Sequence, residues 1–173
     1  MSNYKTRYDK VSAFFNSHKK ALMTLKFFYR FLIIPFIISY AYLLIKLFKL
    51  SGDGNLDNIN QLIKAILAPG TSFIVMSILR LALDAKRPYE LYDIKPLIAK
   101  NKKGQSMPSR HVLSATLIAM TVLYFNQSLG IILLILTFFV AITRVLAGVH
   151  FIKDVFMGIL IGVICTIFGL WLI

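Results

Sequence analysis

Long apolar runs, separated by short polar segments, dominate the pattern of this sequence. Five runs approach or exceed the roughly 20 residues that an α-helix needs to cross a bilayer. Turn-forming residues lie between the runs, and prolines inside two of them predict kinks. The pattern therefore predicts an all-α integral membrane bundle of about five transmembrane helices. The expected helices cover residues 27–48, 61–83, 108–125, 131–146 and 153–173.

The segment 1–26 has a different pattern, in which aromatic residues and leucines are interspersed with lysines and an arginine. This mixture predicts an interfacial amphipathic helix that runs into the first span, with a solvated basic tail as the alternative. We find no internal repeat, and we expect residues 1–173 to form a single membrane domain. The third and fourth spans separate the polar segment that follows the second span from the 146–153 turn. Because two crossings return the chain to the same side, both segments lie on one side of the membrane.

Composition supports this interpretation and narrows the partners. Hydrophobic residues make up 58% of the 173 positions, which excludes an ordinary soluble globular protein. The net charge of +13 comes from 20 Lys and Arg against 7 Asp and Glu, and it favours contact with anionic lipid headgroups. Nucleic acid is not an expected partner, because the basic residues flank membrane spans.

The first polar cluster ends the second span. Arg80 and Arg87 are seven residues apart, so two helical turns place them on one face, and Pro88 stops the helix. Guanidinium groups keep their charge and fit phosphate oxygens. The alternative is an ordinary ion pair between Arg80 and Asp84, with Arg87 reaching to the interface.

The second cluster opens the third expected helix. Ser109 occupies the N-cap position, where free N–H groups and the helix dipole favour an anion, and His111 follows on the first turn. Alternatively, Ser109 is only a cap and His111 is an interfacial histidine.

The third cluster separates the last two spans. Arg144 precedes the turn at Gly148, and His150 and Asp154 are four residues apart, which stacks them on one helix face. A carboxylate that holds one imidazole nitrogen leaves the other free to attack. The alternative is a turn with a surface histidine and an aspartate that caps the helix.

The three clusters together resemble the signature motifs of the type-2 phosphatidic acid phosphatase and vanadium haloperoxidase superfamily. The matching patterns are Arg80-x6-Arg87–Pro88, Pro108–Ser109–Arg110–His111 and Arg144-x5-His150-x3-Asp154. The resemblance runs from about residue 80 to residue 158. Three positions depart from the usual motifs. Arg80 replaces a lysine, Arg110 replaces a glycine, and Thr143 replaces a serine.

The resemblance implies a small integral-membrane lipid phosphatase that needs no metal and no cofactor. His150 would attack phosphorus and form a phosphohistidine, Asp154 would fix its tautomer, and His111 would protonate the leaving oxygen. The phosphate oxygens would be held by Arg80, Arg87, Ser109, Arg110 and Arg144. Three substrates fit this scheme: phosphatidate, phosphatidylglycerophosphate and polyprenyl diphosphate. Nothing in the sequence indicates an oligomeric state.

Two alternatives from other classes are a non-catalytic membrane protein that binds anionic lipid and a vanadate-dependent haloperoxidase. Simple binding would need only the arginines, whereas this chain also has both histidines and Asp154. We expect a bacterial cell membrane location with the site on the cytoplasmic face, because all basic residues except Lys46, Lys49 and Lys64 lie on the site's side. Relatives in the resembling family commonly act at the outer face and have one more span before the first motif than we expect here.

Overall fold

The computed structural model describes residues 3–172, and every regular element in that part of the chain is helical. Four helical segments are long and apolar enough to cross a membrane, and a shorter apolar helix, α6, lies among them. The predicted all-α membrane bundle is therefore confirmed. The elements are α1 Asn3–Ser17, α2 Lys19–Phe31, α3 Ile34–Ser51, α4 Leu56–Leu83, α5 Pro88–Leu91, α6 Arg110–Phe125, α7 Gln127–Leu146, α8 Ile152–Ile167 and the π-helical turn η1 Phe168–Leu172.

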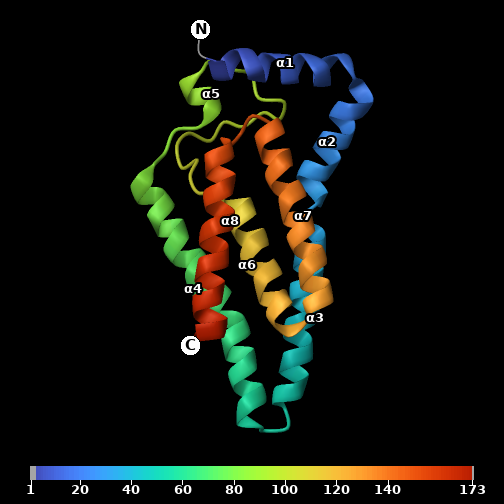
Figure 1. The fold of residues 1–173 in the computed structure, drawn as a ribbon, viewed down its shortest axis with the longest axis vertical. Coiled ribbons are helices and arrows are strands. Elements are labelled where there is room, and N and C mark those ends of the chain that lie inside the picture. The colour runs from blue at the N-terminus through green and yellow to red at the C-terminus, as the bar shows by residue number, and fades with distance from the viewer. Residues whose placement is uncertain (1–2, 173) are drawn as a thin grey trace.

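Helix α6 forms the centre of the bundle and packs against α3, α4, α7 and α8 (Figure 1). More than half of its residues are buried, among them Val112, Leu113, Ala115 and Ala119. The outer helices instead expose large apolar side chains such as Ile38, Val75, Phe138 and Phe156. An apolar exterior suits a hydrocarbon solvent, so the burial pattern agrees with an integral membrane protein.

Small residues allow α8 to lie close to α6. A β-carbon added at Gly162 would come within 2.7 Å of the Thr116 Cβ, and one at Gly158 would lie 3.1 Å from the Ser109 carbonyl oxygen. Such close backbone approach is typical of helix pairs in membranes. These two glycines therefore have a packing role at the contact between α8 and α6.

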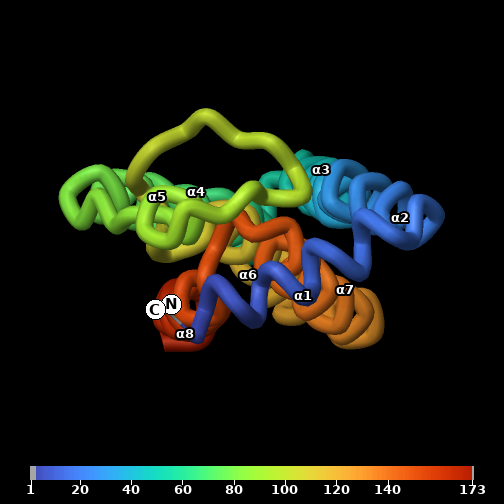
Figure 2. Tube along the Cα trace, turned by 90° about the horizontal axis from the view of Figure 1, so that it is seen from above, coloured from blue at the N-terminus to red at the C-terminus, as the bar shows by residue number. Residues whose placement is uncertain are grey.

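The N-terminal segment differs from the expected single helix over residues 1–26, of which residues 1–2 lie outside the described part of the chain. A break at His18 divides it, and α2 belongs with α3 to one long span, Lys19–Ser51. Helix α1 lies across the ends of α7 and α8, on the side where the second span ends (Figures 1 and 2). Helix α1 is held there by aromatic contacts: the Tyr4 ring lies 4.9 Å from the Tyr92 ring and 5.1 Å from the Phe151 ring, measured between centroids.

Four helix termini lie at the same end of the bundle (Figure 1): the end of α4, the start of α6, the end of α7 and the start of α8. The short helix α5, which the sequence pattern did not predict, and the loop after it lie at this end too. The three polar clusters are thereby brought to one side of the membrane, as the helix count predicted.

Candidate active site

Arg80 and Arg87 converge on one loop. Arg80 is the first of the pair, in the last turn of α4, and its Nη2 donates to the Gln105 carbonyl. Arg87 precedes α5; its Nε donates to the Gly104 carbonyl at 2.9 Å and its Nη1 to the Val149 carbonyl at 3.3 Å. Both side chains are buried. The prediction that the two arginines share a helix face is wrong, because α4 ends at Leu83 and Arg87 has an extended backbone before α5. They meet at the 104–105 loop instead.

These contacts contradict the alternative reading of the first cluster. Arg80 forms no ion pair with Asp84 in the described part of the chain, and Asp84 is an exposed C-cap in the left-handed conformation. Arg87 is 2% exposed and does not extend to the interface. The Arg80 Nε is buried with no hydrogen-bond partner among the described residues. A buried donor of this kind costs free energy unless a ligand accepts from it.

His150, Asp154 and Ser106 form a buried polar group. The His150 Nδ1 lies 3.6 Å from the Asp154 Oδ2, and the Ser106 hydroxyl lies 3.5 Å from the same Nδ1 while it donates to the same Oδ2. Asp154 also accepts from the Phe151 N–H at 2.9 Å, which caps the first turn of α8. The carboxylate is thus fixed by two donors and faces one side of the imidazole.

Burial changes the protonation of His150. It lowers the pKa of the imidazole to about 4, because the cation loses its hydration, and the nearby Asp154 carboxylate only partly offsets this. The ring is therefore neutral at physiological pH, which is the form that can act as a nucleophile. His150 is 2% exposed, so the alternative of a surface histidine does not fit.

Ser109 begins α6 but does not cap it. It stands at the N-cap position, yet its hydroxyl makes no capping hydrogen bond and is buried without a partner in the described residues. Its N–H donates to the Asp154 carbonyl at 2.9 Å, which ties the second cluster to the third. The alternative of a simple cap is therefore wrong, and the hydroxyl remains available to a ligand.

His111 and Arg144 line a common cavity of about 670 Å³, which also contacts α2 and the 96–99 segment. Arg144 is held from α2: its guanidinium carbon lies 3.8 Å from the centre of the Tyr29 ring, and its Nη2 donates to the Tyr29 carbonyl at 3.0 Å. The Arg144 Nε is buried without a partner in the described part of the chain. Arg110, by contrast, has an exposed side chain on the first turn of α6.

A tight turn carries His150 into the site. Gly148 has φ +74°, a conformation that glycine adopts at no steric cost. The Tyr8 hydroxyl would lie 2.4 Å from a β-carbon at Gly148, and this hydroxyl accepts from the Leu97 N–H at 3.1 Å. Helix α1 therefore packs directly against the turn that precedes His150.

Sequence reasoning gave no role to several residues that support the site: Ser106, Tyr29, Tyr8 and Glu90. The Glu90 carboxylate accepts from the N–H groups of Arg87 and Gly104 at 2.8 and 2.9 Å. The contact between Glu90 and the Arg87 N–H joins residues three apart at the start of α5, but the other contacts join residues distant in the sequence, which helical spacing could not reveal. Of these residues, Ser106 could most readily have been proposed from the sequence, because it belongs to the same polar cluster as Ser109.

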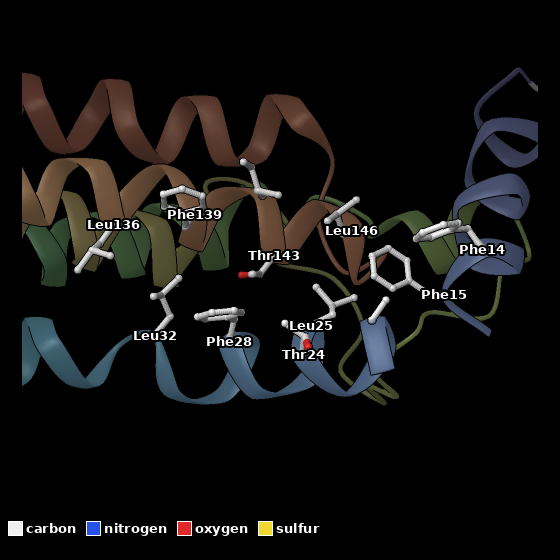
Figure 3. A pocket seen from close by; sticks show the side chains of 12 residues that line it. Phe14, Phe15, Thr24, Leu25, Phe28, Leu32, Leu136, Phe139, Thr143 and Leu146 are labelled. Carbon is white, nitrogen blue, oxygen red and sulfur yellow. The ribbon is translucent and has the colours of Figure 1, made fainter. Parts of the chain in front are cut away.

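A second, apolar cavity of about 620 Å³ lies between α1, α2 and α7 (Figure 3). Phe28 and Leu32 face Leu136 and Phe139 across it, with Thr143 between the two sets. Thr143 is followed directly by Arg144, which lines the polar cavity. The contact between α2 and α7 thus has an apolar cavity on one side and a cationic one on the other.

The fold and the site together define a class: an integral membrane helical bundle with three buried arginines and a buried histidine gathered at one end. The sequence places the chain within that class, because residues 61–173 match the model of the PAP2 superfamily. The chain belongs to this superfamily, and the family predicted from the three motifs is confirmed.

Similar proteins agree with this assignment. The bacitracin transport permease protein BcrC of Bacillus licheniformis is 32% identical over 74 residues, which cover 43% of this chain and 36% of that relative. The crystal structure of Aquifex aeolicus LpxE matches with a TM-score of 0.66 and 28% identity, over 86% of each chain. A transmembrane PAP2-type phosphatidylglycerolphosphate phosphatase from Bacillus subtilis shares the fold, with a TM-score of 0.52 and 20% identity over 95% of this chain and 90% of the other.

Proposed function

We propose that this protein is a metal-independent lipid phosphatase, which hydrolyses a phosphomonoester or diphosphate of a membrane lipid through a phosphohistidine. The single observation that carries this proposal is that Arg80 and Arg87 are bonded to the backbone next to a buried polar group: they donate to the carbonyls of Gln105 and Val149, and the following residues, Ser106 and His150, form that group with Asp154. A fixed cationic environment beside a neutral imidazole supplies what phosphoryl transfer requires, which is positioning and charge stabilisation.

In the proposed reaction, the Nε2 of His150 attacks phosphorus, and the bond from phosphorus to the leaving oxygen breaks. Ser106 and Asp154 hold the Nδ1 side of the ring and stabilise the imidazolium that forms. His111 gives a proton to the leaving oxygen as the general acid. Water then attacks the phosphohistidine, and His111 takes the proton that the water loses. The bond from phosphorus to the His150 Nε2 breaks, which releases inorganic phosphate and returns both histidines to their starting states.

The phosphate oxygens would be held by the arginines at positions 80, 87 and 144, by the Ser109 hydroxyl, and by the N–H groups at the start of α6. Three of these side chains have buried polar atoms without partners in the described residues, which supports a role in ligand binding. Arg110, exposed at the same helix start, would contribute its backbone N–H and headgroup contact.

The substrate is a membrane lipid phosphate in this proposal, with phosphatidate, phosphatidylglycerophosphate and polyprenyl diphosphate as candidates. The site lies at one end of the bundle, where lipid headgroups lie. The apolar cavity beside Arg144 (Figure 3) suits an alkyl chain, because its lining is almost entirely hydrocarbon. We further propose a bacterial cell membrane with the site facing the cytoplasm, in keeping with the basic residues on that side.

Phosphate release by the purified full chain in detergent tests the function. We expect activity on lipid phosphates that is unchanged by EDTA and lost, by at least about a hundredfold, in the variants His150→Ala and His111→Ala. Both variants must keep the wild-type gel-filtration profile. Full activity in either variant would refute the assignment.

The same assay separates the two alternatives. A protein that only binds anionic lipid would retain lipid in a flotation assay but release no phosphate. A haloperoxidase would oxidise halide once vanadate is added, and vanadate would then activate the protein. In our proposal, vanadate inhibits phosphate release by occupying the phosphate site.

A further inference from the structure

Tyr29, in the last turn of α2, contacts the site but has no role in the proposed reaction. The family model matches residues 61–173, so α2 lies before the matched part of the chain. The Tyr29 carbonyl nevertheless accepts from the Arg144 Nη2 at 3.0 Å. Tyr29 therefore reaches the third motif from a helix that contains none of the three motifs.

Buried side-chain atoms without a hydrogen-bond partner are concentrated at the site. In the part of the chain that the structure describes there are five of them. Four belong to residues that the proposed reaction uses: Arg80, Ser109, Arg144 and Asp154. The fifth is the Tyr29 hydroxyl. Buried polar groups are normally paired in folded proteins, so unpaired atoms gathered at one site indicate that a ligand supplies the missing partners.

The chemistry of these unpaired atoms matches an oxyanion. A guanidinium Nε–H can only donate a hydrogen bond, and the hydroxyls of serine and tyrosine can also donate. Apart from the Asp154 oxygen, the five atoms are therefore all potential donors. The oxygens of an ionised phosphate accept hydrogen bonds, and such charge-assisted bonds are stronger than bonds between neutral groups. One phosphate could thus satisfy the Tyr29 hydroxyl together with the Arg144 Nε.

The Tyr29 hydroxyl and the Arg144 guanidinium are neighbours. The guanidinium carbon lies 3.8 Å from the centre of the ring that carries the hydroxyl. Tyr29, Arg144 and His111 also line the same cavity of about 670 Å³. In the proposed reaction His111 protonates the leaving oxygen, so the reacting phosphate must reach this cavity. A phosphate oxygen held by Arg144 would then lie beside the hydroxyl as well.

We infer that Tyr29 is a further phosphate-binding residue, whose hydroxyl donates a hydrogen bond to a non-bridging oxygen of the bound phosphate. This inference rests on the proposed function, because it takes Arg144 and His111 to face that phosphate. The alternative is that the hydroxyl has only solvent as its partner, in which case its removal would leave the affinity for phosphate unchanged.

Tyr29→Phe tests the inference in the purified full chain, because it removes the hydroxyl and keeps the ring and the carbonyl that hold Arg144. The dissociation constant for inorganic phosphate is measured in neutral detergent from the rise in unfolding temperature with phosphate concentration. We expect this constant to increase by at least about tenfold, as for the loss of one hydrogen bond to a charged group. Without phosphate, the variant should unfold at the wild-type temperature or slightly above it, because it loses a buried donor that no described residue satisfies.

The matched control is Tyr40→Phe in α3, which also removes a phenolic hydroxyl. That hydroxyl donates to the Ala65 carbonyl at 2.9 Å. Its loss should lower the unfolding temperature and leave the dissociation constant for phosphate unchanged, which is the reverse of the result expected for Tyr29→Phe. Wild-type phosphate affinity in Tyr29→Phe, or a fall in its unfolding temperature as large as that of Tyr40→Phe, would overturn the inference.

Failure of the proposed function gives a different result, because phosphate binding is measured without turnover. If the wild type binds phosphate through Tyr29 but releases none from lipid phosphates, the phosphatase assignment is wrong and the binding residue remains. If lipid phosphates are hydrolysed in a reaction that needs His150, while Tyr29→Phe binds phosphate as tightly as the wild type, the phosphatase assignment stands and the role of Tyr29 is refuted.

Discussion

At the scale of single residues, the site depends on how one imidazole is held. Sequence spacing suggested a direct contact between His150 and Asp154, but their closest polar atoms are 3.6 Å apart, which is long for a hydrogen bond. The Ser106 hydroxyl contacts both and donates to the carboxylate. Orientation of the ring therefore depends on a serine from a separate loop as well as on the aspartate one turn away.

Ser106→Ala should lower kcat for phosphate release by about ten- to a hundredfold, because the loss of one hydrogen bond to a buried carboxylate costs roughly 1.5–3 kcal/mol and loosens the ring. Steady-state kinetics on purified protein measures this. Ser128→Ala, at an exposed serine near the start of α7, is the matched control and should keep wild-type activity. An unchanged kcat in Ser106→Ala would remove Ser106 from the proposed machinery.

Protonation of His150 should occur well below the ordinary histidine range. Burial lowers the pKa of the imidazole to about 4, so the ring is neutral at pH 7 and gains a proton only in acid, which would inactivate the nucleophile. NMR titration of protein labelled at histidine nitrogens, with the His150 signal assigned through His150→Ala, measures the midpoint. A midpoint at or above the ordinary value of about 6.5 would contradict the burial seen here.

At the scale of elements, the approach of α8 to α6 sets the position of the site. The Ser109 N–H donates to the Asp154 carbonyl, so the first turns of the two helices are directly bonded. Gly158 and Gly162 lie on the face of α8 that contacts α6. Close packing along the helices therefore fixes the distance between the proposed phosphate-binding residue Ser109 and the His150–Asp154 pair.

Gly162→Ala should lower the thermal stability of the protein by several degrees. The added methyl group would meet the buried Thr116 Cβ at 2.7 Å, and overpacking of this kind costs about 1–3 kcal/mol. Thermal unfolding in detergent, followed by circular dichroism, measures the change. Gly70→Ala on α4 is the control, because a β-carbon there meets nothing within 4 Å. Equal melting temperatures for the two variants would show that α8 can move away from α6.

At the scale of the whole molecule, charge is distributed unevenly between the two ends of the bundle. The site end and the N-terminal helices hold every Lys and Arg except Lys46, Lys49 and Lys64. Basic segments remain preferentially in the cytoplasm, although several of the arginines at the site end belong to the proposed phosphate site. The proposed cytoplasmic orientation follows from the lysines, which the proposed chemistry at the reacting phosphate does not use.

Single-cysteine labelling in intact cells tests this orientation, after Cys165→Ser removes the native thiol. Lys103→Cys reports the site end, where the side chain is exposed, and Asn60→Cys reports the opposite end. We expect a membrane-impermeant maleimide to label position 60 and to reach position 103 only after the cells are permeabilised. The reverse pattern would place the site on the outer face.

The sequence alone determined the helical membrane bundle and the residues that meet at its end. Both follow from local properties: apolar runs long enough for a bilayer, and charged groups too costly to place within it unless they are used or paired. Helical spacing also predicted a shared helix face for the pairs Arg80–Arg87 and His150–Asp154. Here it was wrong, because α4 ends at Leu83 and α8 begins at Ile152, which leaves one member of each pair outside the helix.

Only the tertiary structure decided which groups touch. The contact of Ser106 with His150 joins residues 44 positions apart, and the contact of Arg144 with Tyr29 joins residues 115 positions apart. No periodicity in the chain encodes such pairs, because they depend on how α2, α6 and α7 pack. The same packing placed Lys26 and Arg30 on the wall of the cavity that His111 and Arg144 line, where the sequence alone showed only a basic segment before the first span.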